Sequence, residues 1–471
     1  MKYSIAQLLE NNEKITTRKE INVIMALAWP AIVEQIMITM VQYIDTAMVG
    51  SLGANATAAI GLTSSTIWLF NGIMAAAAVG FSVQVAQYMG AKRLEEARNV
   101  VRQAVLFNLC FGVLMAAIAV ALSYPLPRWL GADDAIAADA SIYFRIVGYS
   151  MPFLLSSTLI SSIIRCMGDT KTPMLLNILI NVLNVILNTL FIYPTRTVQL
   201  WGWEFQMWGA GMGVAGAAIG SAVATGVVSI LLLLVLFCKD TPIRIRLRGE
   251  SYRFSKTCLL AVTKLGVPVA LERSTLCVAQ IVITLIISSL GTTAIAANHL
   301  AVTAEALSYL PANGIAAAAT TLVGQAFGAA NPRLAIRFGR LSTYLGMAFM
   351  TATGVLLYLF APELISLFTQ DADVIQLGTV VLRIEAFAQP LFAASIVASG
   401  ALRGAGDTKY PFFISLVSMW GVRITLSALI APHFGLSGVW LAMCIELCVR
   451  GAIFLVRLHR GKWLRPNSLQ Q

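Results

Sequence analysis

Asp45 is one of the few ionisable residues within the apolar stretches of this chain, which is 58% hydrophobic and 12% charged. Glu34 precedes it by eleven residues, about three helical turns, so a helix would place both carboxylates on one face. Further along, four amides recur at spacings of 4, 3 and 4 residues, which forms one stripe on a helix: Asn177, Asn181, Asn184 and Asn188. Carboxylate and amide oxygens suit sodium, and a desolvated Asp can carry a proton near neutral pH. The pattern therefore favours a cation site over simple hydrogen bonding between helices.

Other polar residues in apolar stretches also need a partner or a purpose, because an ionisable group at the centre of a bilayer costs about 3 kcal/mol. We expect a second set to contact a cationic substrate: Glu34, Gln42, Glu272, Gln280 and Glu305. For Glu272, a structural pair with neighbouring arginines is an equally good interpretation. Arg423, Glu446 and Arg450 are predicted to form structural ion pairs, since Glu446 and Arg450 are four residues apart on one helix.

The elements that position these residues are predicted to be membrane spans. The mean hydropathy of +0.78 exceeds what one soluble core could bury. Apolar segments of about 20 residues or more, enough to cross a bilayer as helices, recur along the chain. They predict twelve spans, at 21–49, 55–87, 97–124, 135–164, 172–194, 210–238, 257–290, 294–327, 336–361, 374–402, 410–431 and 436–457.

The basic residues indicate how these spans are oriented. The net charge is +11, and most of the 33 lysines and arginines fall in alternate loops, which argues for membrane topology rather than nucleic-acid binding. Both termini are therefore predicted to be cytoplasmic, in a protein of the inner (plasma) membrane. The first apolar run is long and carries acids, so we expect no removable signal peptide.

The chain repeats itself with a constant offset between its two halves. RCMGDTKTP at 165–173 corresponds to RGAGDTKYP at 403–411, and at the same offset Pro30, Glu34 and Gln42 correspond to Pro268, Glu272 and Gln280. Each half holds six spans, so both halves enter the membrane from the same side and their pseudo-two-fold axis follows the membrane normal. We expect the GDTK phrase to be a cytoplasmic turn between helices rather than part of a gate.

This duplication predicts an all-α polytopic membrane protein with two six-helix lobes. The expected N-lobe covers residues 1–238, a basic cytoplasmic linker covers 239–256, and the C-lobe with its tail covers 257–471.

Several phrases together resemble multidrug and toxic compound extrusion (MATE) transporters. They are VQYIDTAMVGSLG, SYLPANGIAAAATTLVGQAFGA, the paired RxxGDTKxP turns, WGVRITLSAL, and WLAMCIELCVRG followed by RGKW. The resemblance implies a V-shaped pair of lobes and antiport of organic cations against inward sodium or protons. It also places Asp45 at an essential acid and Ser221 at a frequent Thr. Asn188 replaces an Asp common in the family, as in its bacterial NorM-like branch.

The expected function is therefore a secondary active multidrug exporter that binds amphipathic cations within the lipid bilayer. We expect a monomer without a resident cofactor, with sodium or a proton as the coupling ion. An alternative is a flippase for lipid-linked oligosaccharides, which has a related twin-bundle architecture. A membrane-embedded enzyme is a remote alternative, because the sequence shows no HExxH, GxSxG or Walker motif.

Overall fold

The computed structural model describes residues 16–200, 203–239, 241, 243–245 and 254–464. Part of the predicted linker, residues 246–253, and the end of the predicted C-lobe, residues 465–471, lie outside the described residues.

The first bundle consists of helices from the first half of the chain. Its long helices run without interruption because a backbone in hydrocarbon must satisfy its hydrogen bonds internally. They are α2 (Thr17–Gly50), α3 (Ala54–Gly90), α4 (Leu94–Leu122), α6 (Asp134–Cys166), α7 (Lys171–Phe191) and α8 (Gly213–Cys238), with the short α5 (Pro125–Trp129) after α4.

The second bundle repeats this order with more interruptions. Its elements are α9 (Lys256–Ser288), α10 (Thr292–Gly328), α11 (Pro332–Leu359), α12 (Ala361–Ser366), α13 (Ala372–Ala386), α14 (Gln389–Gly404), α15 (Lys409–Leu416), η1 (Val417–Ile424) and α16 (Thr425–Arg460). The η1 segment is a stretch of π-helix that continues α15 into α16.

The described residues contain twelve membrane crossings. Ten helical stretches are long and apolar enough to span, and α13 with α14 forms an eleventh span that is bent by 58°. One of the ten, Lys409–Arg460, has 52 residues, and its length of about 78 Å exceeds twice the bilayer core. Gly435 interrupts it with a φ of 59° and a ψ of −141°, so it makes two crossings. The predicted span 374–402 corresponds to the bent pair α13 and α14, so it is a broken helix.

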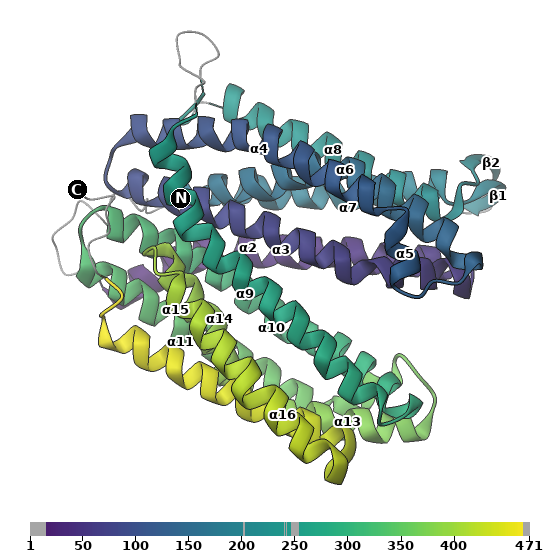
Figure 1. Ribbon diagram of the computed structural model, residues 1–471. Coiled ribbons are helices and arrows are strands. Elements are labelled where there is room, and N and C mark those ends of the chain that lie inside the picture. Colours follow the sequence, from purple (N-terminus) through teal and green to yellow (C-terminus); the bar gives the residue numbers. More distant parts are fainter. Residues whose placement is uncertain (1–15, 201–202, 240, 242, 246–253, 465–471) are drawn as a thin grey trace.

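The two bundles form a V (Figure 1). They meet at the end where α2 begins and α16 ends, and they diverge toward the end that carries strands β1 (Pro194–Leu200) and β2 (Trp203–Ala210). The main contacts between the bundles run from α2 to α10 and from α3 to α9 and α10. The pseudo-symmetry therefore brings the first two helices of each bundle against the other bundle.

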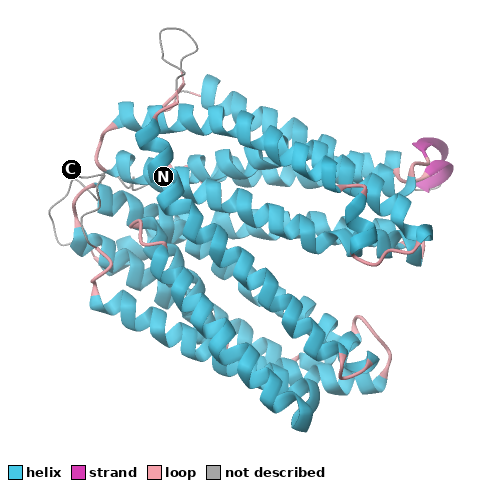
Figure 2. Ribbon diagram, viewed as in Figure 1, coloured by secondary structure: helices cyan, strands magenta, loops and turns pink. Residues whose placement is uncertain are grey.

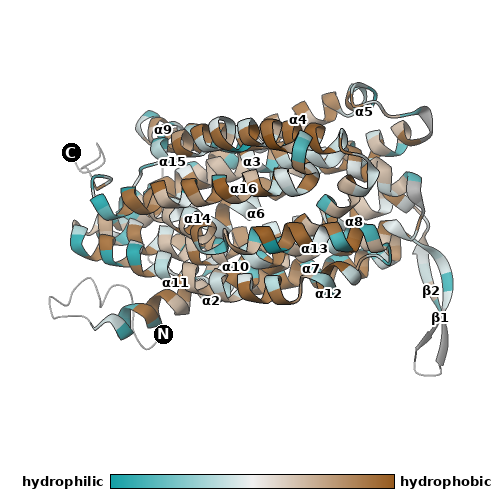
Figure 3. Cartoon of the chain, turned by 90° about the horizontal axis from the view of Figure 1, so that it is seen from below, coloured by the Kyte–Doolittle hydropathy of each residue, from teal (hydrophilic) through white to brown (hydrophobic). Residues whose placement is uncertain are grey.

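Two apolar cores hold the converging end together. Leu27 and Ile32 of α2 pack into a core built mainly by the second bundle, with Phe338 and Phe454. Val262 of α9 likewise packs into a core of the first bundle. Along the helices, hydrophobic residues predominate (Figure 3).

The antiparallel β1–β2 hairpin is the one feature with strands in the described residues (Figure 2). From the sequence we expect no strands, and residues 195–209 are predicted to be a loop between the spans 172–194 and 210–238. A two-stranded hairpin carries little periodic signal of its own, which explains why it was missed.

Candidate functional site

Asp45 lies inside the first bundle, where α2, α7 and α8 meet. Its Oδ1 accepts a hydrogen bond from Asn188 Nδ2 at 2.6 Å, and its Oδ2 accepts one from Ser221 Oγ at 2.7 Å. Asn184 Nδ2 in turn donates to Ser221 Oγ at 2.8 Å. Three helices thus place four predicted residues in one hydrogen-bonded cluster, which we call the acid–amide site: Asp45, Asn184, Asn188 and Ser221.

The acid–amide site can hold either a proton or a sodium ion by its chemistry. All of its side chains offer oxygens, which are the ligands preferred by hard cations. Asn188 Oδ1 is buried and makes no hydrogen bond among the described residues. An amide oxygen without a partner beside a carboxylate fits a cation ligand.

A glycine on α8 makes room for this arrangement. A Cβ added at Gly220 would overlap the side-chain oxygen of Asn188. Any larger residue would therefore push Asn188 away from Asp45.

The other end of the asparagine stripe holds helices together. Asn181 Nδ2 donates to the backbone oxygens of Met37 at 2.9 Å and Asn177 at 3.0 Å. Asn177 Nδ2 lies 3.3 Å from Glu34 Oε1. The stripe is therefore divided between a site around Asp45 and a structural contact with α2.

Glu34 and Glu272 occupy equivalent buried triads. Glu34 pairs with Arg165 at 2.5 Å and is 1% exposed, and the asparagine described above completes its triad. Glu272 pairs with Arg403 at 2.7 Å and accepts from Ser415 Oγ at 3.0 Å. The two triads correspond residue by residue in the internal repeat. Because protein groups already engage these carboxylates, they are poorly placed to receive a cation.

Glu305 differs from both. It lies on α10 and is 7% exposed, and its carboxylate forms no hydrogen bond or ion pair with any residue that the structure describes. Gln42 and Gln280 have exposed side chains that form no hydrogen bond with a described residue. These three side chains remain free to contact a ligand.

The pair predicted on α16, Glu446 and Arg450, lies within ion-pair distance. Glu446 lies 3.1 Å from Arg450 and accepts from Ser418 Oγ at 2.6 Å. Arg423 instead places Nη2 2.7 Å from Met443 Sδ, and within the described ranges it forms no ion pair.

A chain of hydrogen-bonded polar residues in the second bundle was not predicted from the sequence. Glu385 is fully buried and accepts from Gln389 Nε2 at 3.4 Å, and Gln389 Oε1 accepts from Ser308 Oγ at 2.5 Å. Ser308 is three residues from Glu305 on α10, so the chain ends beside that acid. The spacing of Glu385 and Gln389, one helical turn, could have indicated it, but the break before α14 hides the pattern.

The GDTK phrases form turns, as their composition predicts. Gly168 and Gly406 have φ values of 95° and 88°, which favour glycine. Asp169 accepts from the Thr172 backbone N at 3.1 Å and pairs with Lys239 at 2.6 Å. Burial alone would raise the pKa of Asp169, but the hydrogen bonds from Lys239 and Thr172 lower it below its ordinary value.

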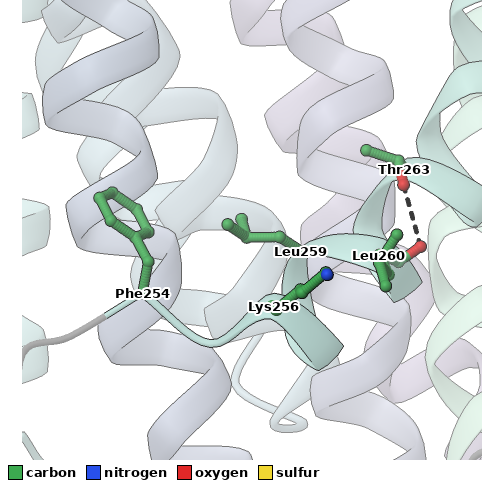
Figure 4. A pocket seen from close by; sticks show the side chains of 5 residues that line it. All are labelled: Phe254, Lys256, Leu259, Leu260 and Thr263. Atoms are coloured by element: carbon green, nitrogen blue, oxygen red, sulfur yellow. Dashed lines mark hydrogen bonds between the residues drawn. The ribbon is translucent and has the colours of Figure 1, made fainter.

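A shallow apolar pocket lies apart from all these groups (Figure 4). Its lining residues belong to the start of α9 and the residues before it: Phe254, Lys256, Leu259, Leu260 and Thr263. It holds no acid, and we assign it no part in the site.

A twin bundle of twelve spans with ionisable groups inside it defines a secondary transporter as the class of protein. The MatE family model matches twice, at residues 30–190 and 268–429, and the two matches begin at Pro30 and Pro268, which the internal repeat makes equivalent. The chain therefore belongs to the MATE family of transporters, which are not enzymes.

Similar proteins cover nearly the whole chain. The "Probable multidrug resistance protein NorM" of Thermotoga maritima is 28% identical over 98% of this chain and 97% of its own. The "Uncharacterized transporter YisQ" of Bacillus subtilis is 26% identical over 94% and 95%. A solved structure described as an "Outward-facing conformation of a multidrug resistance MATE family transporter of the MOP superfamily" matches with a TM-score of 0.87 and 23% identity, over 97% of this chain and 100% of that one. The likeness to this solved structure shows that the chain has the same fold.

Proposed function

We propose that the protein exports amphipathic organic cations by antiport against inward sodium or protons. The observation that carries this proposal is the acid–amide site, a carboxylate held by two helices inside one bundle of a V-shaped pair. The name of the Thermotoga maritima relative, a probable multidrug resistance protein, supports drug-like small molecules as substrates.

Ion binding at Asp45 competes with its present hydrogen bonds. A proton on the carboxylate weakens the charge-assisted hydrogen bonds that Asn188 and Ser221 donate to it, and a sodium ion draws the Asn188 oxygen toward Asp45. Either ion therefore changes how α7 and α8 lie against α2. A ligand shifts a conformational equilibrium only through such differential contacts. The ion therefore favours the arrangement of bundles that binds the drug less well.

The direction of transport follows from the proposed topology. With both termini in the cytoplasm of a bacterial inner membrane, the diverging end of the V in Figure 1 faces outward. We propose lobes at residues 1–238 and 257–471, joined by the linker at 239–256, in a monomer that rocks about its converging end.

Glu305 is the acid we propose for substrate contact, with Gln42 and Gln280. Its carboxylate forms no hydrogen bond or ion pair with a described residue and interacts with Arg423 only through their charges, whereas Glu34 and Glu272 are held by arginines of the neighbouring helices. We therefore propose that Glu34 and Glu272, which the sequence led us to expect at the substrate, instead hold helices together.

One observation favours the flippase as second candidate. Arg273 on α9 is exposed, its Cβ region lies against Gly72 of α3, and it forms no ion pair with a described residue. A guanidinium without an ion pair, at a contact between the two bundles, suits a phosphate-bearing substrate. If this candidate holds, purified protein moves a pyrophosphate-linked lipid but no cationic dye.

The proposal is tested by efflux from liposomes that contain the purified protein. A proton gradient alone and a sodium gradient alone are applied in separate experiments with a cationic dye. We expect one of the two to drive dye movement against its gradient. Dye movement that neither gradient accelerates would reject antiport.

A further inference from the structure

The converging end of the V is closed by two glutamines, one from each bundle. Gln87, near the end of α3, donates from Nε2 to the backbone oxygen of Gly404 on α14 at 3.0 Å. Gln325, near the end of α10, donates from Nε2 to the backbone oxygen of Cys166 on α6 at 2.7 Å. The internal repeat makes the two donors equivalent and the two acceptors equivalent, so these are two copies of one contact across the pseudo-two-fold axis.

The ends of the same helices cross at glycines. A Cβ at Gly90 would overlap the backbone oxygen of Gln325, and a Cβ at Gly328 would overlap that of Gln87. The helices then stop in matching left-handed turns, with a φ of 57° at residue 92 and of 53° at residue 330. Bulkier residues at either glycine would separate α3 from α10 and pull the amides away from their acceptors.

The accepting ends are held rigidly by the repeated phrase. Cys166 and Gly404 directly follow Arg165 and Arg403, the first residues of RCMGDTKTP and RGAGDTKYP. Those arginines are fixed by the buried glutamates of the two triads. The phrase ends in a turn, but the backbone carbonyl of its second residue faces a glutamine of the other bundle.

We propose that these contacts form a symmetric latch that keeps the cytoplasmic end shut and must open once in every transport cycle. The latch consists of two equivalent sets of residues, which are Gln87, Gly90 and Gly404 on one side of the axis and Gln325, Gly328 and Cys166 on the other. This inference rests on the proposed alternating access. It assigns Gln87 and Gln325, which are equivalent in the internal repeat, to the gate rather than to the ligand.

The latch behaves as one two-state unit. The acceptors are backbone carbonyls at helix ends, so they move only with their helices. Both bonds surround one axis, so rocking that breaks one also breaks the other. Removing either amide should therefore raise the open population by a similar factor, about fivefold for one net hydrogen bond.

Cys166 supplies the readout, because it is 4% exposed with the latch shut. In a variant whose other six cysteines are replaced by alanine, the rate of maleimide labelling at Cys166 reports opening. We expect Gln87→Leu, which removes a bond that Cys166 does not make, to speed labelling about fivefold. Gln325→Leu should do the same, and the double variant should label faster than either.

Gln84→Leu is the matched control. Gln84 is also buried on α3, but its Nε2 donates to Gly80 within the same helix at 2.9 Å. Its removal should leave the labelling rate of Cys166 unchanged. The latch is wrong if folded Gln87→Leu protein labels at the parent rate, or if Gln84→Leu accelerates labelling as much. If the leucine variants do not fold, Gln87→Met and Gln325→Met decide by the same criterion.

Labelling requires no ion gradient and no substrate. If the variants speed labelling as predicted but the protein shows no antiport, the proposed function is rejected and the latch stands. If the protein shows antiport but the variants label at the parent rate, the latch is rejected and the proposed function stands.

Discussion

Asp45 accepts hydrogen bonds from two helices, and its equivalent in the second bundle is Ile283, which is 1% exposed in an apolar core. The carboxylate proposed to carry the ion therefore has no equivalent in the second bundle, whereas the buried triads of Glu34 and Glu272 are repeated. The sequence predicted this cluster because the spacing of acid and amides sets their faces. The sequence did not predict which buried acids form ion pairs. Glu34, Glu272 and Glu305 all lie in apolar stretches, and only the structure shows that arginines pair with Glu34 and Glu272.

Replacing Glu305 by Gln should weaken efflux of a cationic dye without loss of protein. The carboxylate has no protein partner within the described residues, so its charge is available to the substrate and contributes little to folding. We expect the dye concentration for half-maximal efflux to rise about tenfold, as for one charge-assisted contact. Unchanged efflux at equal protein level would remove Glu305 from the substrate site.

Glu272→Gln should have the opposite profile. It leaves Arg403 without its partner inside the protein, which costs about 3 kcal/mol for a buried pair. A clear fall in the thermal unfolding temperature of purified protein is expected, and Arg403→Met in the same chain should restore part of it. An unfolding temperature equal to that of the parent would show that the triad does not stabilise the bundle.

At the scale of elements, the contact between α7 and α8 depends on Gly220 of α8, because the absence of a side chain there leaves room for the amide of Asn188 on α7. Gly220→Ala should push Asn188 from Asp45 and raise the ion concentration for half-maximal efflux about tenfold. Gly226→Ala is the control, since a Cβ on that residue of the same helix meets nothing closer than 3.9 Å. Equal ion dependence in the two variants would contradict the proposed geometry of the site.

The spans were predictable as elements, but their interruptions were not. Apolar length identifies α2 to α11 because hydrocarbon demands a helix. The bend between α13 and α14 and the π-helical stretch at Val417–Ile424 lie against other helices of the second bundle, and hydropathy does not encode such local changes of the backbone. Gly435 was the exception, because a glycine shortly after Pro432 marks a break in the sequence itself.

For the molecule as a whole, the constant offset of the internal repeat predicted two bundles and their axis, and the structure adds how they touch. One end is closed by cores that mix residues of both bundles, as Leu27 with Phe454 shows. The sequence analysis favoured a turn over a gate for the repeated phrase. It could not see that the helix end before the turn faces a glutamine of the other bundle, because that contact joins residues from different halves of the chain.

The central claim is that Asp45 exchanges its ion for movement of the two bundles. It is tested most directly by gradient-driven dye efflux from liposomes that contain Asp45→Asn protein. Asp139→Asn, at an exposed position of α6, serves as control. We expect Asp45→Asn to abolish the response to the gradient while folding is retained, and Asp139→Asn to respond like the parent. A full response from folded Asp45→Asn protein would contradict the claim.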